Sequence, residues 1–147
     1  MLFICVENAC RSLMAEAIFN ANPPPGWHAR SAGTLPAAKP NPRVPMMLEE
    51  IGLSVPDHPP RLLTNEMMTD ASIRVTMGCL DSASCPARLR SMEVVDWALP
   101  DPARLDDIGF RGVRDSIRDR VNQLVREIVA RERALPQNGR PNQNGGR

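Results

Sequence analysis

Residues 2–22 read LFICVENACRSLMAEAIFNAN, and the fold prediction rests first on this stretch. Its first four residues, Leu2 to Cys5, form a short apolar run that is typical of a buried strand. A polar loop follows over residues 7–10. The apolar side chains of one helical face then recur at Leu13, Met14, Ala17 and Ile18. The pattern predicts a strand, a tight loop and a helix over residues 11–22, in direct succession.

The rest of the chain continues this alternation. We expect further strands over residues 27–32, 73–77 and 93–97, and further helices over residues 42–51, 64–69 and 105–133. Strands that alternate with helices predict an α/β fold, in which helices cover both faces of a parallel sheet. Ligands of such sheets bind at the carboxyl ends of the strands. Cys5, Cys79 and Asp101 each lie at or just beyond the end of an expected strand.

The length of 147 residues suits one domain. We assign residues 1–133 to a single catalytic domain. Residues 134–147 form a tail, and from Pro136 onward it has no apolar side chain to bury. A segment of this composition is expected to be disordered.

Charge and composition exclude several classes of partner. The chain has 18 basic and 17 acidic residues, and this balance gives no support for nucleic acid or a membrane surface as a partner. We find no signal peptide and no stretch that could span a bilayer, so we expect a cytoplasmic protein, and a monomer. In that compartment Cys5, Cys10, Cys79 and Cys85 are expected to be catalytic or redox-active rather than structural disulfides.

The loop from Cys5 to Ser12 has the residues of an anion site. A strand–loop–helix turn aims backbone N–H groups and a helix N-terminus at one point, and both favour a thiolate and a bound anion there. The fork of Arg11 matches two oxygens of a tetrahedral oxyanion, and Ser12 could donate to the thiolate. The residues alone leave an alternative open, in which Cys5 is a small core side chain and Arg11 an exposed helix residue.

A family resemblance favours the anion site. The segment CVENACRSLMAEA, residues 5–17, resembles the phosphate-binding loop and first helix of the low-molecular-weight protein tyrosine phosphatase superfamily. Later segments resemble its other signatures in order: Ser31-Ala32-Gly33-Thr34, Val75-Thr76-Met77-Gly78-Cys79 and Leu99-Pro100-Asp101-Pro102-Ala103. The resemblance covers about residues 1–130.

The resemblance implies a four-stranded parallel sheet flanked by helices, a flavodoxin-like three-layer sandwich. It implies Cys5 as nucleophile, Arg11 as oxyanion clamp, Ser12 as thiolate donor and Asp101 as general acid. The substrate would bind in the loop formed by Val6, Glu7, Asn8, Ala9, Cys10 and Arg11. Glu7 stands where many relatives have glycine, so the shape of the loop is open to question.

Within the superfamily the chain looks most like the thioredoxin-coupled arsenate reductases. Leu13 follows Ser12 where the phosphatases usually have proline, and the chain has no tyrosine to hold an aromatic substrate beside Asp101. The resemblance implies that Cys5 forms an adduct with arsenate, an analogue of phosphate and sulfate. Cys79 and then Cys85 would carry the resulting disulfide outward to thioredoxin, the external reductant.

Other interpretations stay open. The chain could be a phosphatase that needs only Cys5, Arg11 and Asp101, or a sensor that uses Cys79 and Cys85 as a switch. We expect no bound cofactor. We also expect no zinc site, because the histidines lack zinc-site spacing. In some reductases, however, residues that match Asn8, Glu16 and Ser31 hold a potassium ion. Glu16 could equally be an exposed helix residue, and Cys10 could be structural filler.

Overall fold

Four short parallel strands form the centre of the fold in this computed structural model, which describes residues 1–135. The strands are β1 (Leu2–Cys5), β2 (Arg30–Gly33), β3 (Arg74–Thr76) and β4 (Val95–Asp96). Their order across the sheet is β2-β1-β3-β4, so β1 is an inner strand. Leu2 pairs with Arg30 on one side and with Arg74 on the other. The expected parallel α/β sheet is confirmed.

The inner strand β1 is apolar throughout because both faces of the sheet are covered. Its successive side chains point to opposite faces. Phe3 and Cys5 belong to one buried cluster, whereas Leu2 and Ile4 belong to another. All four are at most 2% exposed. An uninterrupted apolar run is what such a strand requires.

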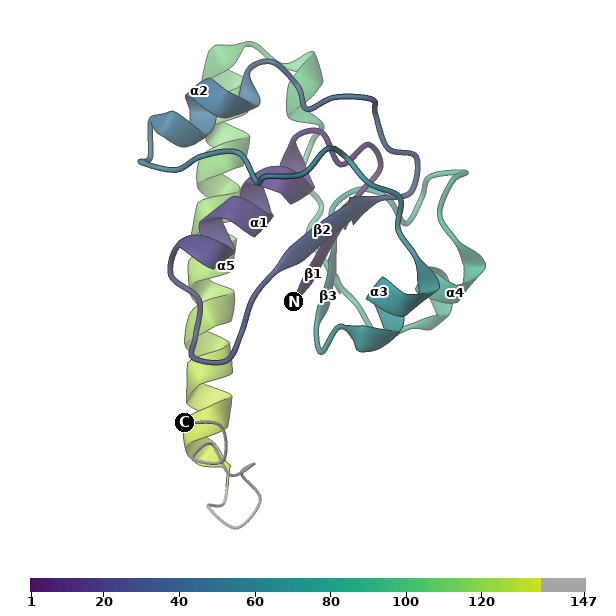
Figure 1. The fold of residues 1–147 in the computed structure, drawn as a ribbon, viewed down its shortest axis with the longest axis vertical. Coiled ribbons are helices and arrows are strands. Elements are labelled where there is room, and N and C mark those ends of the chain that lie inside the picture. The colour runs from purple at the N-terminus through teal and green to yellow at the C-terminus, as the bar shows by residue number, and fades with distance from the viewer. Residues whose placement is uncertain (136–147) are drawn as a thin grey trace.

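Helices form the two outer layers (Figure 1). The cluster around Phe3 is covered by α1 (Arg11–Ala21), α2 (Val44–Glu49) and the long α5 (Asp107–Ala134). The opposite cluster is covered by α3 (Asn65–Asp70) and α4 (Ala87–Ser91). The three-layer sandwich expected from the resemblance is therefore confirmed. No helix within residues 1–135 is long and apolar enough to cross a membrane.

Several boundaries differ from the prediction. β2 begins at Arg30 rather than at residue 27, because the Trp27 N–H donates to the Pro24 carbonyl in a turn. α5 begins after Asp106, whose carboxylate accepts from the Gly109 N–H at 2.8 Å and caps the helix. α4 and a short 3-10 helix over Pro102–Arg104 were not expected.

The predicted domain boundary lies near the C-terminal end of the described residues. α5 continues to Ala134, one residue beyond the expected domain end. Of the predicted tail, residues 136–147 lie outside the described residues. The single domain over residues 1–133 and the disordered tail stay predictions.

Candidate active site

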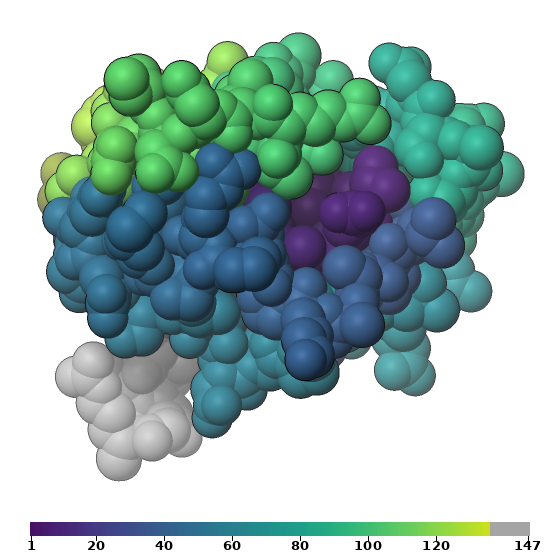
Figure 2. Space-filling view, turned by 90° about the horizontal axis from the view of Figure 1, so that it is seen from above, coloured from purple at the N-terminus to yellow at the C-terminus, as the bar shows by residue number. Residues whose placement is uncertain are grey.

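The loop between β1 and α1 lies in a recess of the molecular surface. Figure 2 shows this N-terminal segment, in purple, set back between segments coloured blue and green. The loop carbonyls point outward, where they accept from a neighbouring segment: Val6 from Leu35 N at 2.8 Å, Glu7 from Ala37 N at 2.9 Å, and Ala9 from Asn41 N at 3.0 Å. In a trans peptide the N–H lies opposite its carbonyl. The following N–H groups therefore face the inside of the loop, as an anion site requires.

Asn8 holds the loop and orients Ser12 toward the Cys5 thiol. It is fully buried and has a φ of 52°, a left-handed conformation that asparagine tolerates. Its Oδ1 accepts from the Arg61 backbone N–H at 3.1 Å, so its Nδ2 is the atom that donates to Ser12 Oγ, at 2.6 Å. The Ser12 proton is then free to point at Cys5 Sγ, 2.9 Å away, which favours the thiolate. The backbone partner of Asn8 lies 53 residues along the chain.

Glu7 fits the loop without strain. Among the described residues, Asn8 is the only non-glycine residue with a positive φ, so position 7 does not need glycine for its backbone. The Glu7 side chain is exposed rather than buried in the loop. The departure from the family pattern thus leaves the loop geometry intact.

Arg11 is held at the mouth of the loop by the segments that follow β3 and β4. It is 8% exposed, and its Nη1 donates to the Leu99 carbonyl at 3.0 Å. Its guanidinium lies against Gly78, where an added Cβ would be 2.6 Å from Nη1. Gly78 also has a φ of +77°, so both the backbone and the close approach favour glycine there. The bond to Leu99 uses one of five N–H donors, and the fork can still present others to an oxyanion.

A pocket of about 200 Å³ brings three of the predicted catalytic residues together, Cys5, Arg11 and Asp101. Its walls are Cys5, Val6, Glu7, Ala9, Cys10, Arg11, Asp101 and Arg104. Asp101 Oδ1 accepts from the Ala103 N–H at 3.0 Å, so the carboxylate also caps the short 3-10 helix. The loop after β4 thereby places a proton donor or acceptor in the same pocket as the Cys5 thiol.

Cys10 also lines this pocket, but it does not resemble a nucleophile. Burial, followed by the negative charges of Asp101 and Cys5, raises the pKa of its thiol to about 12. Cys10 is 6% exposed and packs in the cluster beneath α1. The geometry fits the structural role considered for it.

Cys79 and Cys85 lie in the cluster on the other face of the sheet from Cys5. Cys79 is fully buried, and its Sγ lies 3.8 Å from the Ile4 carbonyl oxygen. Burial, and then the neighbouring thiols of Cys85 and Cys5, raise its pKa to about 12. In this conformation Cys79 is a protonated, covered thiol.

The segment between these two cysteines folds on itself. The Ser82 N–H donates to the Cys79 carbonyl, and the Cys85 N–H donates to the Ser82 carbonyl. A hydroxyl pair, Thr34 Oγ1 and Ser84 Oγ at 2.7 Å, joins the segment to the residue after β2.

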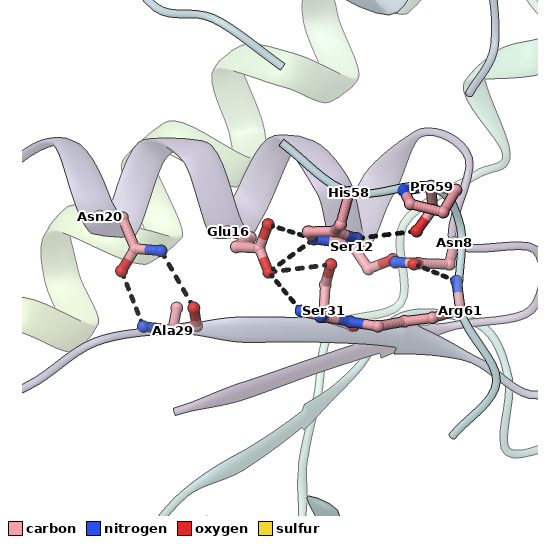
Figure 3. Close-up of polar contacts among 9 residues, drawn as sticks. All are labelled: Asn8, Ser12, Glu16, Asn20, Ala29, Ser31, His58, Pro59 and Arg61. Atoms are coloured by element: carbon pink, nitrogen blue, oxygen red, sulfur yellow. Dashed lines mark hydrogen bonds and ion pairs between the residues drawn. The ribbon is translucent and has the colours of Figure 1, made fainter. Parts of the chain in front are cut away.

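The structure brings Asn8, Glu16 and Ser31 together, and it adds two residues that the sequence interpretation had not linked to them (Figure 3). Glu16 is 4% exposed, so it is not the exposed helix residue considered above. Its Oε2 contacts His58 Nε2 at 2.8 Å, and its Oε1 accepts from Arg61 Nη2 at 3.2 Å.

A sequence signal for this cluster exists on α1. Ser12, Glu16 and Asn20 recur every four residues and therefore lie on one side of the helix. Ser12 bonds to Asn8, Glu16 to Ser31 and Asn20 to Ala29. This polar row faces β2, whereas the apolar face turns into the core. Within residues 1–135 there is no group of three or more His, Cys, Asp or Glu side chains suited to a metal ion.

The fold and the loop define an enzyme class built on a phosphate-binding loop with a cysteine. The chain belongs to the low molecular weight phosphotyrosine protein phosphatase family, whose model matches residues 1–135. It is 31% identical over 127 residues to arsenate reductase 1 of Staphylococcus epidermidis, covering 86% of this chain and 95% of that protein.

Solved structures show the same relationship. An arsenate reductase from Archaeoglobus fulgidus superposes with a TM-score of 0.69 at 34% identity, covering 84% of this chain and 97% of that one. A thioredoxin-dependent arsenate reductase of Corynebacterium glutamicum has a TM-score of 0.72 at 32% identity over 88% of this chain. The match spans only 61% of that Corynebacterium chain. An arginine phosphatase of Geobacillus stearothermophilus, at 23% identity and a TM-score of 0.76, shares the fold.

Proposed function

We propose that this protein is an arsenate reductase that carries its oxidising equivalent from Cys5 through Cys79 to Cys85, and from there to thioredoxin in the cytoplasm. The observation that carries the proposal is the pairing of a cysteine anion loop with two further thiols in one neighbouring segment. The arsenate reductases among the relatives, at 31–34% identity, support the same assignment.

The first step uses the pocket around Cys5. Arsenate binds to the inward N–H groups of the loop and to Arg11. The Cys5 thiolate, with Ser12 as its donor, attacks arsenic and forms an S–As bond. Asp101 supplies the proton with which the displaced hydroxide leaves as water.

The second step is the reduction. The Cys79 thiolate attacks Cys5 Sγ, the S–As bond breaks, and its electron pair stays on arsenic, which passes from As(V) to As(III). Arsenite leaves, and a Cys5–Cys79 disulfide remains. The two thiols have together lost the two electrons that arsenic gained.

The third step moves the disulfide to Cys85. The Cys85 thiolate attacks Cys79 Sγ and releases Cys5, so that the product is a Cys79–Cys85 disulfide. The dithiol of thioredoxin then reduces this disulfide by the same kind of exchange. Small polar side chains between the two cysteines suit a segment that has to change conformation during this transfer.

Cys79 has to move for this chemistry. Its thiol is covered, bonded to the Ile4 carbonyl and shifted toward the protonated form. We infer that the segment over residues 79–86 opens after the adduct forms, which would expose Cys79 and bring it to the loop.

A phosphatase is the second candidate. Asp101 in the same pocket as Cys5 and Arg11 favours it, because this set is sufficient for hydrolysis of a phosphomonoester through a phosphocysteine. It needs neither Cys79 nor Cys85.

The deciding experiment measures arsenate-dependent oxidation of NADPH in the presence of thioredoxin and thioredoxin reductase. Wild-type protein is compared with Cys79→Ser and Cys85→Ser. We expect steady turnover by the wild type and at most one turnover by each variant. If both variants match the wild type, or if arsenate gives no oxidation while an aryl phosphate is hydrolysed, the phosphatase takes the place of the reductase.

A further inference from the structure

We infer that the guanidinium of Arg61 is a built-in cation at Glu16, that it positions the anion loop, and that this chain therefore binds no potassium ion between Asn8, Glu16 and Ser31. The inference does not depend on whether Cys5 attacks arsenate or a phosphomonoester, because it concerns how the loop is held.

The buried carboxylate of Glu16 already has its partners. A carboxylate that is 4% exposed needs a nearby positive charge or several donors. Oε1 accepts from Arg61 Nη2 at 3.2 Å and from Ser31 Oγ at 3.3 Å. Oε2 lies 2.8 Å from His58 Nε2. Histidine is charged only when it is protonated, whereas arginine is always charged, so Arg61 is the permanent counter-charge.

The other oxygens that could bind a cation are engaged as well. Asn8 Oδ1 accepts from the Arg61 backbone N–H at 3.1 Å, and the Ser31 carbonyl accepts from Arg61 Nε at 2.9 Å. Within residues 1–135 every buried side-chain nitrogen and oxygen has a hydrogen-bond partner. No oxygen of the cluster is left turned toward a missing ion, and a second cation would lie against the guanidinium.

Arg61 joins Glu16 to Asn8, because its side chain and its backbone N–H each make one of the two contacts (Figure 3). Its side chain is anchored on Glu16 and Ser31, and its backbone N–H holds Asn8. Asn8 in turn orients Ser12 toward Cys5 Sγ. Arg61 is thus a positioning residue, which acts on Cys5 only through Asn8 and Ser12.

The test replaces Arg61 with glutamine, which removes the charge and offers a carbonyl oxygen in its place. The thermal unfolding midpoint is measured in about 0.1 M KCl and in choline chloride of equal ionic strength. The rate of Cys5 alkylation by iodoacetamide is measured in the same two salts. Neither readout requires arsenate or a phosphate ester, so failure here is distinct from failure of the proposed function.

For the wild type we expect the same midpoint and the same alkylation rate in both salts. For Arg61→Gln we expect the midpoint in choline chloride to fall by about 5 °C and Cys5 alkylation to slow several-fold. KCl should restore part of both losses, because the vacated place then fits a potassium ion. Arg30→Gln, an equal loss of charge at an exposed position on β2, should change neither readout.

The double variant Glu16→Gln with Arg61→Gln keeps the test decisive if the single variant folds poorly. Without the buried carboxylate, potassium should have no effect. A wild-type midpoint that rises in KCl would overturn the absence of a potassium site. An Arg61→Gln protein with wild-type alkylation of Cys5 in choline chloride would overturn the positioning role.

Discussion

The loop over residues 5–12 and the segment over residues 79–91 carry the two halves of the proposed chemistry, and they are built in opposite ways. The loop is cross-linked to distant parts of the chain, through Asn8 to Arg61 and through Arg11 to Leu99. The cysteine segment closes on itself mainly through short turns. Side-chain bonds join it to its surroundings: Ser84 with Thr34, Arg88 with Thr69, and Cys79 with the Ile4 carbonyl.

The two regions differ because the anion loop has to be rigid, whereas the cysteine segment has to move. An anion site has to be preorganised, because its donors stabilise charge only if they are in place before the reaction. A thiol relay has to move, because each sulfur attacks a different partner in turn. In the proposed mechanism the nucleophile is therefore fixed on one face of the sheet, and the next thiol lies covered under the other face.

The largest expected effect concerns the stored thiol. At pH 8 we expect Cys79 in the native protein to react with iodoacetamide about 10³-fold more slowly than in urea, because a pKa of about 12 in place of the ordinary value of 9.0 lowers the thiolate fraction by that factor. Peptide mapping by mass spectrometry, with increasing labelling time, measures both rates. Equal rates would mean that the segment is already open and that the contrast with the loop is wrong.

A smaller effect, on catalysis, is expected where Gly78, just after β3, contacts Arg11. Gly78→Ala places a Cβ 2.6 Å from Arg11 Nη1, so the clamp has to shift. We expect kcat/KM for arsenate, measured by the coupled oxidation of NADPH, to fall about 10- to 100-fold. A misplaced catalytic group produces an effect of this size.

Gly52→Ala is the matched control for that variant. Gly52 has the same φ of +77°, but an added Cβ meets nothing within 4 Å. Its variant should lose about 1 kcal/mol of stability and keep its kcat/KM. If the two variants lose activity equally, backbone strain rather than displacement of Arg11 is the cause.

The smallest effect is expected when the hydroxyl pair of Thr34 and Ser84 is removed. Ser84→Ala removes the 2.7 Å contact with Thr34 Oγ1 and the 2.8 Å contact with Ser82 Oγ, so the cysteine segment should open more often. A hydrogen bond contributes about 0.5–1.5 kcal/mol, which corresponds to a roughly two- to thirteenfold rise in native-state labelling of Cys79. Ser91→Ala, which removes a bond to Arg88 within α4, should leave the labelling rate unchanged.

The sequence predicted the loop well because its information is local. A short apolar run, a polar loop and a helical apolar face are contiguous over residues 2–22, and the structure has β1, the loop and α1 there. Short elements were harder to predict. α4 has five residues with one buried side chain, Leu89, so it shows no periodicity and was not predicted. β4 lies within the strand expected over residues 93–97, but it has only two residues, both exposed.

The supporting contacts of the site were beyond the sequence for a different reason. The bond between Arg61 and Asn8 joins positions 53 residues apart, and the pairing of His58 with Glu16 spans 42 residues. Nothing local in a proline-rich loop indicates which buried charge it will meet. The row of Ser12, Glu16 and Asn20 on α1 marked the place of these contacts without naming their partners.

The separation of Cys5 from Cys79 by the sheet has a consequence for how such proteins can diverge. The residues proposed to bind and attack an oxyanion line a pocket to which the segment over residues 79–91 contributes nothing, whereas the proposed second and third thiols lie within that segment. Substitutions confined to that one segment could therefore add or remove electron transfer while the attacking site stays as it is. One scaffold can in this way serve either hydrolysis or reduction, and the choice between them is made some distance from the atom that reacts first.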